Sequence, residues 1–349
     1  MKKLCALLLV LVMGISLVAC GSGTTETKAP ETTAAETTAA ETEAAETEAP
    51  ASSAGLITVG FSQVGAESDW RTANTTSMKD TFTEENGYTL IFDDAQQKQD
   101  NQITAIRNFI QQEVDYIVLA PIAETGWDTV LQEAKDAGIP VIIVDRMIDV
   151  SDDSLFTSWV GSDFRAEGDK AVAWMEDKFA DADVVNIVHL QGTIGSSAQI
   201  GRTEALEAGV KANDTWDLAA QQTGEFTQAK GQEVMESILK QNSEIDVVYA
   251  ENDNMAFGAI DAIEAAGKTV GVDGDIAVIS FDATHAGLEM VLEGKINFNV
   301  ECNPLHGPRV AELIEMLESG KTPEKLNYVE EEAFDAATFT QEDLDARAY

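Results

Sequence analysis

The chain has 349 residues, of which 44% are hydrophobic, which is enough for a large core or for two lobes. It carries 62 acidic and 22 basic side chains, so its formal net charge is −40. A charge of this size repels nucleic acid and anionic lipid head groups, so it excludes polyanionic partners and favours a neutral ligand or a basic protein partner.

The first 20 residues have the pattern of an export signal. Two lysines precede an almost wholly apolar run over residues 4–18, which is shorter than the roughly 20 residues of a membrane-spanning helix. This pattern predicts a secretory signal peptide over residues 1–19. The sequence Leu-Val-Ala-Cys that ends at Cys20 resembles a bacterial lipobox, which implies that Cys20 is lipidated and holds the protein on the outer face of the cell membrane. An ordinary signal peptide with an incidental Cys is the alternative.

Residues 20–55 are expected to form the lipidated Cys and an acidic linker. Glutamates recur every five residues at positions 31, 36, 41 and 46, a spacing that does not line one face of a helix. Because the segment has no apolar face to bury, we predict that it is disordered and extended. A helical stalk is the alternative, since Ala and Glu favour helix.

From residue 56 onward, short apolar runs alternate with amphipathic stretches. Strands are predicted at residues 57–62, 89–93, 116–120, 141–145, 184–190, 247–250, 276–281 and 298–301. Helices are predicted at residues 102–112, 127–137, 168–179, 203–212, 231–241 and 255–266. This alternation predicts parallel sheets covered by helices on both faces, and the length exceeds one comfortable doubly wound sheet, so two similar lobes are expected.

Polar residues follow the carboxyl ends of these strands, where ligands bind in open parallel sheets. They occur at residues 62–71, 145–146, 191–197 (leading to Arg202) and 251–254, and at Asp282. We therefore expect polar side chains from both lobes to converge on one cleft.

The chain resembles the type I periplasmic sugar-binding proteins of bacterial ABC importers, of the ribose and galactose kind, and within them the galactofuranose-binding receptors. The resemblance covers most of residues 57–349 and lies in the segments 59–65, 67–71, 96–102, 120–121, 125–127, 144–146, 190–193, 230–237 and 252–253. It implies an α/β fold with two similar doubly wound parallel-sheet lobes, joined by a three-crossing hinge near residues 161, 300 and 328. On this basis the N-terminal lobe comprises residues 56–160 and 303–329, and the C-terminal lobe comprises residues 161–302 and 330–349.

The resemblance also implies a ligand site that draws on both lobes. The implied ligand-binding residues are Glu67, Ser68, Asp69, Trp70, Arg71, Asp145, Arg146, Arg202, Asn252, Asp282 and Phe226, the last as an aromatic side chain that closes over the sugar ring. The chain departs from ribose receptors at Cys302, where those proteins have Gln, and this favours another sugar.

The chemistry of these residue types fits a sugar. Carboxylates accept hydrogen bonds from pairs of hydroxyls, guanidinium groups donate them, and a Trp ring offers a flat apolar face. Structural explanations remain open: Asp145 and Arg146 as an ion pair, Trp70 and Phe226 as core residues, Arg202 paired with Glu204 or Glu207, and Asn252 with Asp253 as a helix cap.

Motifs of catalysis are missing from the sequence. Its three histidines, at positions 189, 285 and 306, lack metal-ligand spacing, and no nucleophile-elbow, Walker or Rossmann pattern occurs. We therefore expect no catalytic residue, metal or cofactor. The predicted function is capture of a galactofuranose- or galactose-like monosaccharide by a monomeric receptor that delivers it to an ABC permease and its ATPase subunit. A sugar-sensing receptor coupled to a membrane kinase and an extracellular glycoside hydrolase are the alternatives.

Overall fold

The computed structural model describes residues 55–349 of the chain. The expected signal peptide, Cys20 and all but the last residue of the expected linker lie outside the described residues. Within residues 55–349, none of the helices combines the length and the hydropathy needed to cross a bilayer.

The first of two sheets has the strand order β11-β5-β4-β3-β1-β2, and all its strand pairs are parallel. Its strands are β1 (Ile57–Gln63), β2 (Tyr88–Asp94), β3 (Tyr116–Leu119), β4 (Val141–Val144), β5 (Ser158–Gly161) and β11 (Leu326–Tyr328). Every residue of β3 and β4 is buried, as expected for apolar strands covered by helices on both faces.

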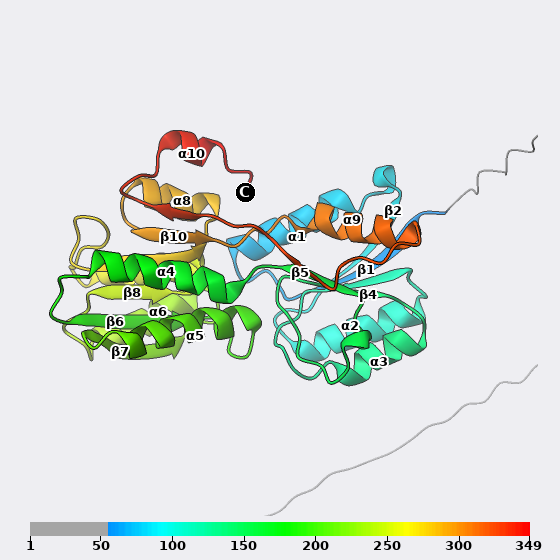
Figure 1. The fold of residues 1–349 in the computed structure, drawn as a ribbon, viewed down its shortest axis with the longest axis horizontal. Coiled ribbons are helices and arrows are strands. Elements are labelled where there is room, and N and C mark those ends of the chain that lie inside the picture. Colours follow the sequence, from blue (N-terminus) through cyan, green and yellow to red (C-terminus); the bar gives the residue numbers. More distant parts are fainter. Residues whose placement is uncertain (1–54) are drawn as a thin grey trace, which may run out of the picture. The chain divides into compact units, whose positions relative to one another are not determined.

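Two helix pairs cover this first sheet (Figure 1). Helices α1 (Asp69–Thr81) and α9 (His306–Glu318) pack together, as do α2 (Gln99–Gln111) and α3 (Asp128–Asp136). Val118 of β3 belongs to the core with α1 and α9, whereas its neighbours Ile117 and Leu119 belong to the core with α2 and α3. Two single-turn 3₁₀ helices, η1 (Glu84–Asn86) and η2 (Asp153–Leu155), lie in the connections.

The second sheet repeats the pattern with the order β12-β10-β9-β8-β6-β7. Its strands are β6 (Val185–Gln191), β7 (Trp216–Thr223), β8 (Val247–Ala250), β9 (Ala277–Asp282), β10 (Phe298–Glu301) and β12 (Ala333–Asp335), and only β12 runs antiparallel to its neighbour. Its helices are α4 (Phe164–Lys178), α5 (Ser197–Ala212), α6 (Gln228–Leu239), α7 (Asp253–Ala265), α8 (His285–Leu292) and α10 (Gln341–Asp345).

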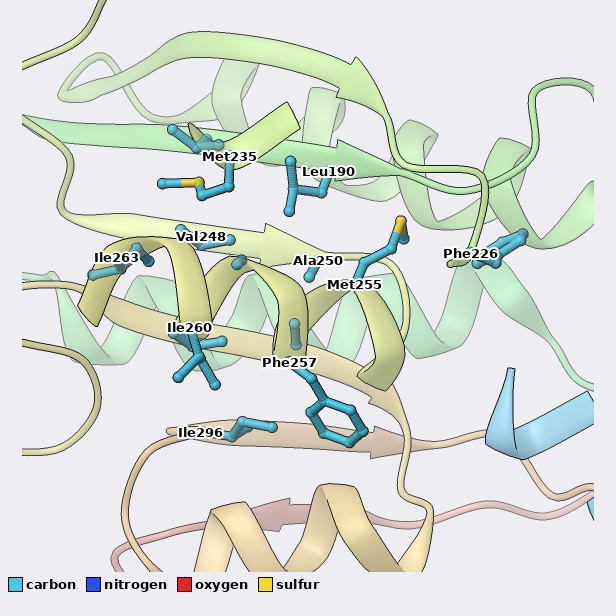
Figure 2. Packing of buried hydrophobic residues seen from close by; sticks show 14 of the residues in the cluster. Leu190, Phe226, Met235, Val248, Ala250, Met255, Phe257, Ile260, Ile263 and Ile296 are labelled. Atoms are coloured by element: carbon cyan, nitrogen blue, oxygen red, sulfur yellow. The ribbon is translucent and has the colours of Figure 1, made fainter. Parts of the chain in front are cut away.

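The core of this second lobe forms between the sheet and one set of helices. Figure 2 shows Ile260 and Ile263 of α7 beside Val248 and Ala250 of β8, with Met235 of α6 nearby. The opposite face of the sheet packs against α4 and α5 in a separate cluster. Both sheets are therefore buried on two sides, as in a doubly wound fold.

The chain passes between the two sheets three times. These crossings lie between β5 and α4, between β10 and α9, and between β11 and β12. The predicted fold class, two similar doubly wound lobes of α/β type, is confirmed.

Candidate functional site

Most of the candidate site lies where strands end and helices begin. The Ser68 hydroxyl caps α1 by accepting a hydrogen bond from the Arg71 N–H at 3.1 Å, and Asn252 caps α7 by accepting one from the Met255 N–H at 2.9 Å. Each cap satisfies a free donor of the first helical turn, so these polar side chains stabilise the local fold while they face the cleft. The cap role predicted for Asn252 and its position in the site therefore coexist.

A cluster of alternating charges comes from the first lobe. Arg71 on α1 lies 2.9 Å from Glu67 and 2.8 Å from Asp145, measured between nitrogen and oxygen atoms. Arg146 lies 3.8 Å from Glu67 and 3.9 Å from Asp145, and it donates a hydrogen bond to the Ile122 carbonyl at 3.0 Å. The two cations and two carboxylates compensate one another.

Burial and pairing set the ionisation of this cluster. Burial alone would raise the pKa of the Asp145 carboxyl, but Arg71 and Arg146 outweigh it and hold that pKa below its usual value. Burial, assisted by the positive charge of Arg71, lowers the pKa of Arg146 to about 10. Both groups are therefore charged at neutral pH.

The second lobe contributes a matching cluster around Arg202 of α5. Its Nε donates to Glu167 of α4 at 2.7 Å, and its Nη2 lies 3.8 Å from Asp282. Helices α4 and α5 approach closely because Gly168 lacks a side chain; a Cβ atom there would lie 2.4 Å from the Cβ of Ala205. Burial raises the pKa of Asp282 well above its usual value, and Arg202 opposes this only in part.

Aromatic rings complete the walls. The guanidinium of Arg71 lies 4.6 Å from the Trp70 ring, and that of Arg146 lies 5.1 Å from the ring of Phe226, which belongs to the second lobe. The Trp70 Nε1 donates to the Cys302 carbonyl at 2.6 Å, which joins α1 to the second crossing. Such stacked contacts fix the orientation of the guanidinium groups.

Three of these residues have left-handed backbone conformations. The φ angles are 63° at Asp145, 60° at Phe226 and 104° at Asp282. Positive φ values are unfavourable for residues other than glycine, and strained backbone of this kind is typical of functional sites.

These side chains line a pocket between the lobes, with about 290 Å³ of space that atoms do not fill. It is lined by Glu67, Ser68, Trp70, Arg71, Asp145, Arg146, Phe164, Ala198, Arg202, Phe226, Asn252, Asp282 and Cys302. Arg71, Asp145, Arg146 and Arg202 are each no more than 3% exposed.

The lobes also contact each other around the cavity. The Glu124 N–H donates to the Gly195 carbonyl at 2.9 Å, and the Met147 N–H donates to the Ser197 hydroxyl at 2.8 Å. Both bonds join a residue of the first lobe to one of the second. The structure therefore has the lobes closed over the cavity.

Comparison with known proteins identifies the family. Residues 59–307 match the family described as periplasmic binding protein domain, which is more than half of the chain. The chain belongs to this family. The galactofuranose-binding protein YtfQ of Escherichia coli is 43% identical over 270 residues, which cover 76% of this chain and 84% of that protein. The ribose import binding protein of Bacillus subtilis is 30% identical over 240 residues, which cover 68% of this chain and 74% of that protein.

Solved structures resemble this periplasmic binding protein closely. A Mycobacterium smegmatis protein in complex with β-D-fucofuranose is 47% identical with a TM-score of 0.78, and the match covers 81% of this chain and 92% of that one. A galactofuranose-binding protein is 41% identical with a TM-score of 0.78, and the match covers 83% of this chain and 97% of that one. The binding protein of a Shewanella arabinose ABC transporter, bound to α- and β-L-arabinofuranose, is 43% identical with a TM-score of 0.76, covering 80% and 92%. The expected type I periplasmic sugar-binding family is thereby confirmed.

The structure brings together ten of the eleven side chains expected at the site; Asp69 is the exception. Asp69 is exposed, and its carboxylate lies 3.3 Å from the Asn254 amide, which donates to it from α7. Each helical residue is rotated by about 100° from the one before, so Asp69 points away while Trp70 and Arg71 face the cavity. Arg202 pairs with Glu167 and Asp282, and not with Glu204 or Glu207 as the structural alternative required.

Two lining residues, Phe164 and Ala198, were not expected at the site, and Cys302 was singled out only as a departure from ribose receptors. Phe164 follows β5, a strand that the sequence pattern did not reveal, so the end of that strand was not considered. Ala198 has no polar atom in its side chain to mark it. Cys302 follows the predicted strand 298–301 directly, and this position was the signal that could have placed it in the cleft.

Among residues 55–349, one group of side chains offers metal-ligating atoms within 4.8 Å of one another: Glu167, Cys302 and Glu331. The Arg202 guanidinium already donates to Glu167, and the Ser162 hydroxyl donates to Glu331 at 2.6 Å. Arg202 already compensates the charge of Glu167, and Ser162 and Asn303 already donate to one oxygen of Glu331, so we assign no metal to the group.

Proposed function

We propose that this periplasmic binding protein captures a monosaccharide in its furanose form, of the galactofuranose class, and delivers it unchanged to an ABC importer. The observation that carries the proposal is the enclosed cavity, in which three guanidinium groups, three carboxylates and aromatic rings from both lobes face one small volume. Three relatives are named for, or hold, furanose sugars, and they share 41–47% sequence identity with this chain.

The charge balance of the cavity supports a neutral ligand. Arg71, Arg146 and Arg202 are each paired with carboxylates of the protein, so a ligand with a net charge would leave one of these groups uncompensated. A sugar hydroxyl can donate to a carboxylate and accept from a guanidinium group at the same time. The same residues therefore suit a polyhydroxylated ligand without net charge.

Closure of the lobes explains how such a ligand would be held. The lining residues are too buried for a sugar to enter while the lobes are in contact, so binding requires an open arrangement. A sugar that contacts both lobes stabilises the closed arrangement and shifts the population toward it. The closed receptor would then dock on the permease, whose ATPase subunit drives import.

We further propose that the protein acts as a monomeric lipoprotein on the outer face of the cell membrane. The support is the lipobox-like sequence that ends at Cys20, followed by an acidic linker. Cys20→Ser should abolish lipidation, so the protein should leave the membrane fraction and appear in the soluble fraction. A Cys20→Ser variant that stays with the membrane would refute the lipid anchor.

The proposed function is tested with free arabinose, galactose, fucose and ribose, since these sugars equilibrate between ring sizes. Calorimetry should show tight binding of at least one of the first three, and a crystal of the complex should show a furanose ring in the cavity. Chromatography should recover the sugar unchanged, and chromogenic furanosides should stay intact. Binding of a pyranose alone would refute the ring form, whereas no binding or a cleaved glycoside would refute the receptor.

A further inference from the structure

Glu331 joins the three segments that connect the lobes. It lies in the third crossing, between β11 and β12, and its Oε1 accepts hydrogen bonds from the other two crossings. The Ser162 hydroxyl of the first crossing donates to it at 2.6 Å, and the Asn303 N–H of the second crossing donates at 2.7 Å. Rotation of the lobes changes backbone torsions in these segments, so it must disturb this arrangement.

Glu331 faces a second carboxylate across the hinge. Oxygen atoms of Glu167 and Glu331 and the Cys302 Sγ lie within 4.8 Å of one another. Glu167 is 1% exposed, and its Oε1 receives no hydrogen bond from any group in residues 55–349. Two buried carboxylates that lie this close resist being charged together, and a proton held by the pair removes that repulsion.

The charged groups around Glu331 favour that proton. Burial is the largest cause of the raised pKa of Glu331. The negative charges of Glu167 on α4 and Glu301 on β10 raise this pKa further, and it is about 9. The Lys170 ammonium binds the Glu331 backbone carbonyl, at 2.7 Å, rather than its carboxylate.

The remaining charges around the third crossing do not neutralise the pair. Glu330, Glu332 and Arg347 line an open surface pocket with Glu301 and Glu331, and Arg347 is bound to Glu301 at 2.9 Å. The Tyr349 hydroxyl also donates to Glu301, and Arg202 is engaged with Glu167. No cation among residues 55–349 therefore pairs with the Glu331 carboxylate.

We propose that Glu167 and Glu331 share one proton when the lobes are closed and release it when they open, so that sugar binding takes up a proton and weakens as pH rises. The inference rests on the proposed function, because sugar binding is taken to be the event that closes the lobes. Two residues connect the carboxylate pair to the sugar cavity. Arg202 and Cys302 both line the cavity, Arg202 is paired with Glu167, and the Cys302 Sγ lies beside both carboxylates.

The direction of the pH dependence follows from the linkage between proton binding and lobe closure. The proposal takes opening to expose Glu331 to water, which would return its pKa toward the 4.5 of a free Glu side chain, whereas its pKa in the closed structure is about 9. Between these two values the closed form holds a proton that the open form lacks, so closure is favoured at low pH and disfavoured as pH rises toward 9. For one whole proton the association constant falls about tenfold per pH unit in this window.

Calorimetry of sugar binding at pH 8, repeated in buffers of different ionisation enthalpy, measures the protons taken up. We expect the wild-type protein to take up roughly half to one proton per sugar. Glu331→Gln should remove most of this uptake, because the Gln amide can donate to Glu167 permanently while its oxygen still accepts from Ser162. The affinity of the variant for sugar should therefore fall less steeply between pH 7 and pH 9 than that of the wild type.

Glu330→Gln is the matched control, since it removes the same charge from the neighbouring, exposed residue. It should behave as the wild type, and melting temperatures should show that all three proteins are folded. Asp282, which has a raised pKa, also contributes to the proton uptake of all three proteins, so the inference is judged on the difference between Glu331→Gln and Glu330→Gln. Equal uptake in the wild type and Glu331→Gln, or equal loss in both variants, would overturn the inference.

A second measurement detects the proton directly in closed protein, either saturated with sugar or in ligand-free crystals of the closed form. A proton shared by Glu167 and Glu331 adds a carboxylic acid C=O band to the infrared spectrum at pH 8, beside any band from Asp282, and this added band should be missing in Glu331→Gln. If no sugar binds, the proposed function fails, and the spectrum of the closed crystals decides the inference. Closed wild-type protein whose acid band equals that of Glu331→Gln would overturn the shared proton.

Discussion

Replacement of Asp145 by Asn tests the candidate site with little change in shape. Asp145 has a φ of 63°, a conformation that Asn tolerates as well as Asp does, so the backbone is expected to stay as it is. The change removes one buried negative charge that lies 2.8 Å from Arg71 and 3.9 Å from Arg146. It therefore isolates the contribution of the carboxylate.

The size of the effect follows from the hydrogen bonds that a charged acceptor makes. Hydrogen bonds to charged groups contribute about 1.5–3 kcal/mol, which corresponds to a roughly 10- to 150-fold loss of sugar affinity. The protein should also lose about 1–3 kcal/mol of stability, because Arg71 and Arg146 then share Glu67 as their remaining carboxylate. Calorimetry measures the first effect and the melting temperature measures the second.

Asp69→Asn is the matched control, because it makes the same chemical change two residues from Glu67 on a side chain that does not line the cavity. An exposed polar contact contributes about 0–1 kcal/mol, so affinity should fall no more than about fivefold. The reasoning is refuted if Asp69→Asn weakens binding as much as Asp145→Asn does, or if folded Asp145→Asn binds sugar like the wild type.

Two further substitutions probe the second lobe. Arg202→Met should weaken sugar binding at least tenfold, since it removes the guanidinium that pairs with Glu167 and faces Asp282; calorimetry that shows wild-type affinity in a folded variant would contradict this. Gly192→Ala should also weaken binding, because a Cβ atom there would lie 1.9 Å from the Phe226 ring and would displace it. Gly55→Ala, where nothing lies within 4 Å, is its control and should bind normally.

Much of the architecture could be predicted because burial on both faces leaves a simple pattern. Strands β3 and β4 are unbroken apolar runs, and they were placed to within a residue. Helix α1 was harder, because its run of Thr, Asn and Ser has low helix propensity. The Ser68 cap and packing against α9 hold it in place, and neither is visible as periodicity.

Short and half-exposed strands escaped prediction for a different reason. Strand β7 lies at the edge of its sheet and has no fully apolar face, while β11 and β12 have three residues each. Their positions depend on pairing with distant strands. The residues of these strands alone do not indicate which distant strand each one pairs with.

The site itself was predictable in composition but not in its pairings. Asp145 and Asp282 were found because they end or follow apolar strands. The partnership of Arg202 with Glu167 was not found, since 35 positions separate the two residues and only the close packing of α4 on α5 joins them.

The left-handed backbone at Asp145 and Asp282 limits how this receptor could be retargeted to a new sugar. Most amino acids would cost about 1–2 kcal/mol at such positions, so a mutant library that varies them would consist largely of weakened proteins. Only Asn and Gly are tolerated there as alternatives. Diversity is better introduced at Phe164 and Ala198, which face the same cavity from ordinary helices and can change size without backbone strain.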